Sequence, residues 1–286
     1  MTPIPSISDA RVLVLGATGK TGRRVLEQLR ARGVPVRAGS RGATPSFDWE
    51  QAATWPAALA GCTSVYVSFQ PDLAVPGALQ TVSAFFAEAR RANVQHIVLL
   101  SGRGEIEAEQ AEQALAACGV PWTVLRASWF AQNFSEGFFQ PSLQLAGLLG
   151  LPVGDVREPF VDVDDIADVA VAALTDPARH QGRLYELTGP EALSFADAVA
   201  LIDRASGRAL QFVTISPEQF RAEMGPAGVP AQAIDLALYL FSTVLDGRNT
   251  AVANGVQQAL GRPPKAFADF AHDAAATGVW QPLALG

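Results

Sequence analysis

Apolar runs alternate with amphipathic stretches through roughly the first 125 residues of the chain. The runs are rich in branched residues and are typical of strands covered on both faces. Between them, apolar residues recur at helical spacing, as Val25, Leu26 and Leu29 do within 20–32. The runs lie at 12–15, 34–38, 63–69, 96–100 and 120–125. This alternation predicts an α/β fold with a Rossmann-like, doubly wound parallel sheet.

The pattern changes after Arg126. An aromatic stretch at 128–149 is followed by a helix expected at 166–175 and a strand at 185–187, and helical spacing then dominates. Helices are expected at 195–206, 217–224, 231–245, 250–260 and 264–276, with a short strand at 210–214. The sequence therefore predicts a Rossmann domain at 1–188 and a smaller, mostly helical substrate or lid region at 189–286.

Three glycines, Gly16, Gly19 and Gly22, follow the first strand at a spacing of three. In dinucleotide-binding folds the first makes a tight turn, the second lets the backbone approach a phosphate, and the third lets the helix pack close to its strand. The helix start adds N–H groups and a positive dipole end. The motif predicts a dinucleotide site that also includes Thr18, Lys20 and Thr21. A simple connecting turn is the alternative, whereas the spacing does not fit a nucleotide triphosphate loop.

The second strand ends in Gly39-Ser40-Arg41-Gly42, without an acidic residue. An Asp or Glu at this place hydrogen-bonds the ribose of NAD, whereas an Arg can pair with the 2′-phosphate of NADP. We therefore expect NADP(H) rather than NAD(H), with Arg41 as the main contact and Ser40 and Arg37 as secondary candidates. For Arg37, a solvated position on the strand is the favoured interpretation.

Two further segments are expected beside the cofactor. Asp48 and Trp49 are candidates for the border of the adenine ring, although Asp48 is an equally good helix N-cap. The strand at 63–69 ends at the carboxyl edge of the sheet, where ligands of such folds bind. Its terminal residues Ser68, Phe69 and Gln70 are therefore cofactor candidates, and Gln70 is also a candidate for substrate contact.

Aromatic residues cluster just beyond the strand at 120–125. Such residues can form the wall of an apolar ligand pocket, and packing in a core is the alternative. The candidates for substrate contact are Trp129, Phe130, Asn133, Phe134 and Phe138.

Composition narrows the partners. Of the 286 residues, 49% are hydrophobic and 17% charged, and the net charge of −7 without a basic block argues against nucleic acid. Two cysteines indicate neither a disulfide framework nor a metal site, and His96, His180 and His272 do not form a site. Met1–Asp9 shows no export pattern and no apolar run reaches membrane-spanning length, so we expect a cytoplasmic protein without membrane contact.

Several motifs together resemble the NmrA-like group of atypical short-chain dehydrogenases, and within it the ergot-alkaloid reductases, the festuclavine and agroclavine dehydrogenases. The resemblance rests on the residues at 16–22, 38–41, 47–49, 120–126, 129–134, 160–167, 261–265 and 267–271. It implies a reductase of secondary metabolism that uses NADPH to reduce a cyclic iminium.

One departure from the short-chain dehydrogenase pattern bears on the chemistry. The Tyr-x-x-x-Lys pair, in which the Tyr gives a proton to a carbonyl oxygen, would fall at Gly104 and Ala108. Ser101 stands where the family has a substrate-binding Ser, and without its partners it would contact only the nicotinamide. An iminium is already cationic and needs orientation and shielding rather than an acid.

Polar candidates near the pocket are Arg103, Glu105 and Asn133, and we take Ser101, Asn133 and Arg103 as the catalytic candidates. Their alternatives are a solvated loop charge for Arg103, a helix-start carboxylate for Glu105 and a structural hydrogen-bonding role for Asn133.

Two other functions are compatible with the missing pair. One is a non-catalytic, redox-sensing NADP(H)-binding partner of the NmrA type, and the other is a cyclase or isomerase on the same fold. The aromatic stretch favours a reductase with a small-molecule substrate. The late helices suit a homodimer as well as a lid, and the sequence leaves substrate identity and reaction direction open.

Overall fold

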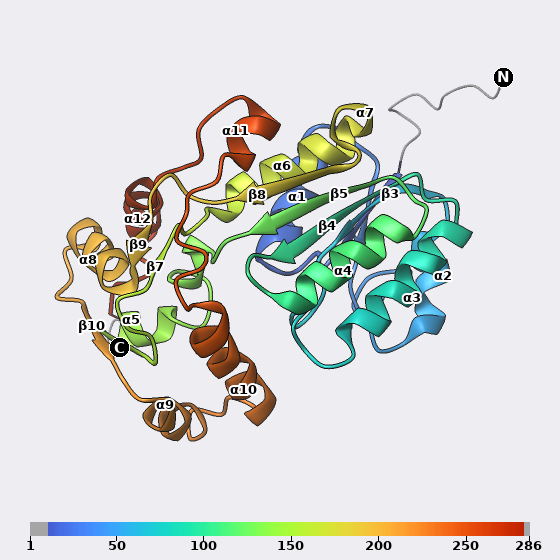
Figure 1. The fold of residues 1–286 in the computed structure, drawn as a ribbon. Coiled ribbons are helices and arrows are strands. Elements are labelled where there is room, and N and C mark those ends of the chain that lie inside the picture. Colours follow the sequence, from blue (N-terminus) through green and yellow to red (C-terminus); the bar gives the residue numbers. More distant parts are fainter. Residues whose placement is uncertain (1–10, 283–286) are drawn as a thin grey trace. The chain divides into compact units, whose positions relative to one another are not determined.

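The computed structural model describes residues 11–282, and the chain divides into two compact units (Figure 1). Unit 1 contains residues 11–127, 163–187 and 254–262, and unit 2 contains residues 128–162, 188–253 and 263–282. The segment Met1–Asp9, for which the sequence predicts no export signal, lies outside the described residues.

Unit 1 is built on a six-stranded parallel sheet with the order β2-β1-β3-β4-β5-β8. The order reverses between β1 and β3, and the carboxyl ends of strands at such a switch point form the usual ligand crevice of doubly wound folds. The predicted Rossmann-like sheet is thus confirmed. The strands are β1 (Arg11–Leu15), β2 (Val36–Gly39), β3 (Cys62–Val67), β4 (His96–Gly102), β5 (Trp122–Ala127) and β8 (Arg183–Leu187).

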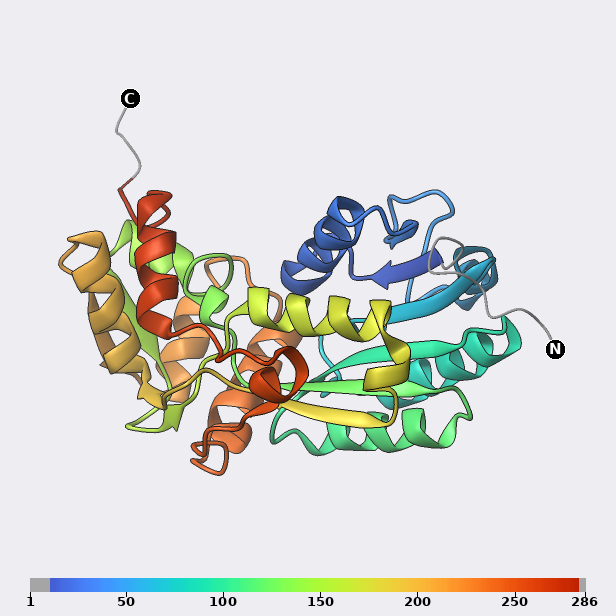
Figure 2. The same ribbon diagram turned by 90° about the horizontal axis from the view of Figure 1, so that it is seen from above.

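Helices cover both faces of this sheet (Figure 2). On one face α3 (Ala78–Arg91) packs against α4 (Ile106–Ala117), and on the other α1 (Lys20–Ala31) packs against α6 (Val163–Thr175). Because neither face meets water, the strands consist of near-continuous apolar runs. The shorter helices of the unit are η2 (Ala52–Thr54), α2 (Trp55–Leu59), α7 (Pro177–His180) and α11 (Gly255–Leu260).

The late helix α11 belongs to unit 1 although the sequence places it among the C-terminal helices. A Cβ atom on Gly255 would lie 2.2 Å from the carbonyl oxygen of Glu186, so only glycine permits this approach to β8. Just beyond the helix, Arg262 pairs with Asp165 at 2.6 Å and with Asp168 at 2.5 Å, both on α6. These contacts return residues 254–262 to unit 1. The chain therefore passes between the two units at several points besides the boundary expected near residue 188.

Unit 2 has its own apolar core, in which phenylalanines from distant segments meet. Strand β6 pairs in parallel with β10, and β7 pairs antiparallel with β9. Of these strands, the sequence indicates only β10. The elements are η3 (Ala131–Asn133), α5 (Gln140–Leu145), β6 (Leu148–Leu151), β7 (Arg157–Glu158), β9 (Leu193–Ser194), α8 (Phe195–Ser206), β10 (Gln211–Thr214), α9 (Pro217–Met224), α10 (Ala231–Tyr239), η4 (Leu240–Val244) and α12 (Phe267–Ala276).

Between residues 11 and 282, none of the helices combines the length and hydropathy needed to cross a membrane.

Two buried histidines are linked at the amino ends of β4, β5 and β8. The Thr123 hydroxyl donates to the His180 carbonyl at 2.8 Å and lies 3.0 Å from Nε2 of His96. Because the hydroxyl proton is already donated, Nε2 of His96 must be the donor in that contact. His180 in turn contacts the Tyr185 hydroxyl through Nδ1 at 2.9 Å. Burial, followed by the proximity of His180, lowers the pKa of His96 to about 4.

This shift predicts a loss of stability in mild acid. The unfolded state binds a proton at its ordinary pKa of about 6.5, whereas folded His96 stays neutral, so the free energy of unfolding should fall as the pH drops from 6.5 toward 4. The contribution of His96 should be about 2 kcal/mol between pH 7.5 and 5. Urea denaturation at the two pH values measures it. His96→Gln should remove most of this difference, and an unchanged difference would contradict the assignment.

Candidate active site

The turn between β1 and α1 is shaped by glycine. Gly16 has φ +65°, and its carbonyl accepts the Gly19 N–H at 2.8 Å. Gly19 is the N-cap of α1 and supplies no side-chain cap to this 12-residue helix. The helix N-terminus carries partial positive charge and therefore favours an anion such as a pyrophosphate.

Close packing around this turn excludes side chains at two glycines. A Cβ atom on Gly22 would lie 2.2 Å from the Gly16 carbonyl oxygen, and one on Gly16 would lie 3.2 Å from Cβ of Ser68, just after β3. The glycine turn therefore lies at the switch point of the sheet. These residues fit a dinucleotide, because bare backbone and a helix start lie where such folds hold the cofactor phosphates. Beside them Thr18 is exposed, whereas Thr21 is buried next to Tyr66 of β3.

Of the two arginine candidates for the 2′-phosphate, Arg41 is exposed and Arg37 is half-buried. Arg41 lies in the loop after β2, and Ser40 before it is half-buried. Arg37 is instead bound to the last turn of α2, where its Nη1 donates to the carbonyl oxygens of Ala58 at 2.5 Å and Ala60 at 2.9 Å. Arg37 is therefore neither solvated, as the sequence suggests, nor directed toward a phosphate.

The Asp48 and Trp49 candidates lie in an ordered loop. An oxygen of Asp48 accepts the Glu50 N–H at 3.0 Å, which agrees with a local structural role for its carboxylate. The Trp49 ring lies 4.9 Å from the Phe69 ring between centroids and is only partly buried. Trp49 and Phe69 together form an aromatic surface after β2 and β3, and Gln70 beyond them is exposed.

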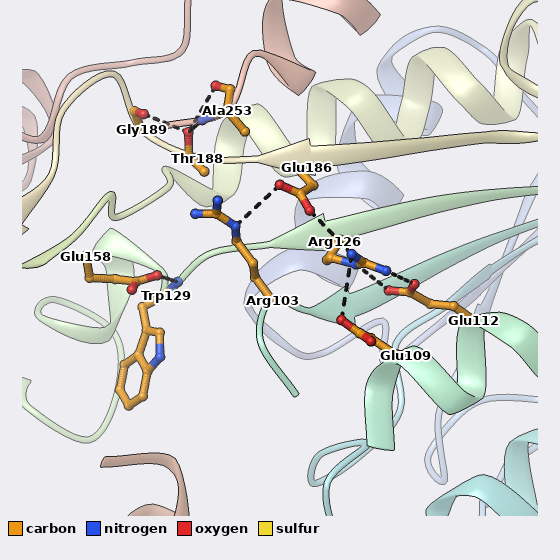
Figure 3. A network of polar contacts seen from close by, with 10 residues as sticks. All are labelled: Arg103, Glu109, Glu112, Arg126, Trp129, Glu158, Glu186, Thr188, Gly189 and Ala253. Atoms are coloured by element: carbon orange, nitrogen blue, oxygen red, sulfur yellow. Dashed lines mark hydrogen bonds and ion pairs between the residues drawn. The ribbon is translucent and has the colours of Figure 1, made fainter. Parts of the chain in front are cut away.

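A charged network ties the carboxyl ends of β4, β5 and β8 together (Figure 3). Ser101 is 4% exposed, and its hydroxyl donates to Glu112 of α4 at 2.6 Å. Glu112 also accepts from Arg126 Nε at 2.9 Å, and Arg126 reaches Glu186 at 3.3 Å. The structure thus places Ser101 against α4 with its proton engaged.

The same network holds Arg103. Its Nε lies 3.5 Å from Glu186, and its backbone N–H donates to the Ala127 carbonyl at 3.0 Å. Sequence reasoning missed this network, although an acidic residue on a helix and an arginine at a strand end were visible signals of an ion pair.

A second polar contact at this edge was also missed. The side chains of Asp72, in the loop after β3, and Glu105, the N-cap of α4, lie within hydrogen-bonding reach of each other. One oxygen of Asp72 also accepts the Ala74 N–H at 2.8 Å. The Glu105 carboxyl lies over Gly102, where a Cβ atom would approach its oxygen to 2.1 Å. Burial, followed by the charge of Asp72, raises the pKa of Glu105 to about 9.

The aromatic candidates of unit 2 separate into core and surface. Phe134 is fully buried, and its ring lies 5.1 Å from that of Phe139. Phe138 is 41% exposed, and Trp129, half-buried, lies with its ring 5.3 Å from that of Phe241.

Two more candidates belong to the turn η3. Phe130 is half-buried and is the N-cap of this turn, with its carbonyl accepting the Asn133 N–H at 3.0 Å. The Asn133 carbonyl in turn accepts the Phe139 N–H at 3.3 Å. The turn therefore fixes the backbone of both candidates beside the aromatic residues of unit 2.

A parallel sheet whose switch point holds a glycine turn beneath a helix N-terminus defines the Rossmann class of NAD(P)-binding proteins. Within that class the chain belongs to the NmrA-like family, since a family model of that description matches residues 107–254 and one described as NAD(P)H-binding matches residues 16–177.

Individual relatives agree with this assignment. The NAD(P)H azoreductase of Xenophilus azovorans is 30% identical over 91% of this chain and 96% of its own, and the agroclavine dehydrogenase of Claviceps fusiformis is 30% identical over 92% and 96%. The fold is shared with the NADPH-dependent quinone oxidoreductase QOR2 of Escherichia coli, solved with NADPH, at 22% identity and a TM-score of 0.78, covering 92% of this chain and 99% of the other. The chain is thus an NAD(P)H-binding oxidoreductase of the atypical short-chain dehydrogenase type, and the expected likeness to ergot-alkaloid reductases is confirmed.

Gly22→Ala should damage the cofactor site. The added methyl group meets backbone atoms that cannot turn away, so α1 must move from the β1 turn. We expect NADPH affinity to fall at least tenfold, equivalent to about 1.4 kcal/mol, in a titration followed by nicotinamide fluorescence. Gly154→Ala is the matched control, because a Cβ atom there meets nothing within 4 Å. Wild-type affinity in Gly22→Ala would show that the close packing is not required.

Proposed function

We propose that the chain is an NADPH-dependent reductase that transfers a hydride to a small, apolar, cyclic iminium or conjugated substrate in secondary metabolism. The observation that carries the proposal is the missing proton-donating pair. The sequence has two lysines, Lys20 and Lys265, and a glycine rather than a tyrosine stands four residues before each. A cationic iminium accepts a hydride without an acid, so binding and orientation are sufficient for its reduction.

The proposed cofactor site follows the glycine turn and the strand ends. The backbone at Gly16, Gly19 and Gly22 would hold the pyrophosphate at the start of α1, with Thr18, Lys20 and Thr21 beside it. Trp49 and Phe69 would border the adenine, and Asp48, Ser68 and Gln70 would complete this edge. Bound NADPH supplies the hydride, whereas these residues fix its position. Exposed Arg41, with Ser40, would select NADP(H) over NAD(H) by pairing with the 2′-phosphate.

Replacing Arg41 tests the cofactor preference. Arg41→Ala should raise the Kd for NADPH by about 10- to 100-fold, as expected for the loss of a charge-assisted contact, and should leave the Kd for NADH within a factor of two. Fluorescence titrations with both cofactors measure the change. Arg30→Ala is the control, because Arg30 is an exposed cation in the last turn of α1, far from its N-terminus. Equal losses for NADPH and NADH would contradict a 2′-phosphate contact.

The proposed substrate contacts are aromatic. Trp129, Phe130 and Phe138 retain exposed ring surface, and an aromatic face attracts a cationic iminium. Phe134 would support them from the core. Asn133 would orient the substrate, and Gln70, in unit 1, is a separate candidate for substrate contact.

Ser101 and Arg103, at the end of β4, would support the cofactor site without taking part in the chemistry. Because the hydroxyl of Ser101 is donated to Glu112 and Arg103 pairs with Glu186, we propose that both hold the strand end that supports the nicotinamide.

The relatives support catalysis over redox sensing. Two relatives, an NAD(P)H azoreductase and an agroclavine dehydrogenase, have the names of redox enzymes. Each matches over nine-tenths of this chain. A sensor would bind NADP(H) without oxidising or reducing it. An assay of NADPH oxidation therefore distinguishes a sensor from a reductase.

The reaction class can be tested with the wild-type protein and a panel of acceptors. We expect NADPH oxidation, followed by absorbance, to depend on a cyclic iminium and to be slower with simple ketones, because a neutral carbonyl accepts a hydride less readily than a cation does. Trp129→Ala should raise the KM for the iminium about tenfold, whereas Trp129→Phe, which keeps an aromatic face, should stay near wild type. Reduction of simple aldehydes and ketones but of no iminium would overturn the proposal.

A further inference from the structure

Asp72 and Glu105 form a carboxyl pair that the proposed hydride transfer does not yet use. The two side chains lie within hydrogen-bonding reach of each other. Two carboxylates in such contact cannot both remain ionised, because each repels the charge of the other, so the pair must hold one proton between them. Neither residue is fully exposed. This arrangement stores a proton at neutral pH.

The pair lies at the edge of the sheet where the cofactor is expected. Asp72 follows β3 and Glu105 follows β4, and these strands are neighbours. Ser68, four residues before Asp72, lies beside the glycine turn at the switch point, since a Cβ atom on Gly16 would come within 3.2 Å of its Cβ. The carboxyl ends of β1, β3 and β4 therefore carry, in this order, the phosphate cradle, its neighbour Ser68 and the carboxyl pair. In doubly wound folds the dinucleotide binds in the crevice outside the carboxyl ends of the strands, at the switch point.

Glycine at position 102 makes the arrangement possible. The Glu105 carboxyl occupies the space that a side chain on Gly102 would fill, and Cδ lies 2.3 Å from the position of the absent Cβ. The carboxyl group is thus held directly over the last residue of β4. The Ala74 N–H fixes one oxygen of Asp72 at 2.8 Å. Both ends of the pair are therefore positioned by backbone.

The charges around the pair favour retention of the proton. Glu107, in the first turn of α4, adds negative charge that raises the pKa of both Asp72 and Glu105. Arg103, the neighbouring cation in the sequence, pairs with Glu186. Burial is the largest influence on both carboxyls and acts in the same direction.

We propose that the Asp72–Glu105 pair is the proton donor for neutral conjugated acceptors, taking the role that a tyrosine has in other short-chain dehydrogenases. The inference rests on the proposed hydride transfer and supplies the proton that its conjugated substrates need. With a quinone, the acceptor gains a hydride and is reduced while NADPH is oxidised to NADP⁺. The O–H bond of the pair breaks as its proton passes to the oxygen that gains negative charge. A proton from water then restores the pair. A permanently cationic iminium takes up the hydride alone and needs no such proton.

The two acceptor classes provide the test. Rates of NADPH oxidation are measured from pH 6 to 10 with a para-quinone and with an N-methyl cyclic iminium salt. Glu105→Gln, which keeps the shape but cannot donate a proton, should lower kcat with the quinone at least about 100-fold and leave the iminium rate within twofold. Asp72→Asn should shift the alkaline limb of the quinone profile to lower pH, because Glu105 then loses its proton more easily. Glu223→Gln, which removes an exposed carboxylate on α9, is the control and should change neither rate more than twofold.

A second readout does not depend on turnover. Infrared difference spectra of the cofactor-free protein should show a protonated carboxyl at pH 7 that is lost in alkali and is absent from Glu105→Gln. NADPH affinity should be unchanged in that variant. A full quinone rate in Glu105→Gln, or no protonated carboxyl at pH 7, would overturn the inference and leave the proposed hydride transfer intact. Absence of turnover with both acceptors in the wild type would instead overturn the proposed function and the acid role with it.

Discussion

The approach of α1 to the end of β1 is the constraint on which the site depends. The helix comes so near that the Gly16 carbonyl oxygen occupies the place of a Gly22 side chain. This approach directs the positive end of α1 toward the crevice beside β3. A helix set back by the thickness of one methyl group would still cover the sheet, but its N-terminus would no longer lie against the switch point. The glycine spacing thus serves the binding geometry more than the stability of the fold.

Much of the fold could be predicted because its signals are local. The strands of unit 1 are buried on both faces, so each appears as an apolar run, and the structure places β1, β3 and β4 within a few residues of the expected bounds. The glycine turn was equally visible, because backbone conformation at Gly16 and close packing at Gly22 restrict the residue type directly. The strands of unit 2 have only two to four residues, which is too short for the alternation of apolar and polar residues that marks a strand in a sequence.

The polar contacts of the site could not be predicted in the same way, because each joins residues far apart in the sequence. Nothing beside Arg37 reveals that its partners are the final carbonyls of α2, about twenty residues later. Ser101 stood at the expected strand end, but the orientation of its hydroxyl toward Glu112 depends on how α4 packs. Spacing alone likewise could not separate buried Phe134 from exposed Phe138, since both belong to one aromatic stretch.

The return of α11 and Arg262 to the first unit has a consequence for how the chain is made. Each unit is assembled from three separate segments, and unit 1 receives its last one only at residues 254–262. During synthesis, Asp165 on α6, which is 2% exposed in the folded chain, gains its partner Arg262 only after about a further 97 residues have been made. All six strands of the sheet precede residue 188, whereas the helix α11 that packs on β8 comes later in the chain. Because each unit consists of three segments, neither can be exchanged with that of a relative as a single uninterrupted stretch.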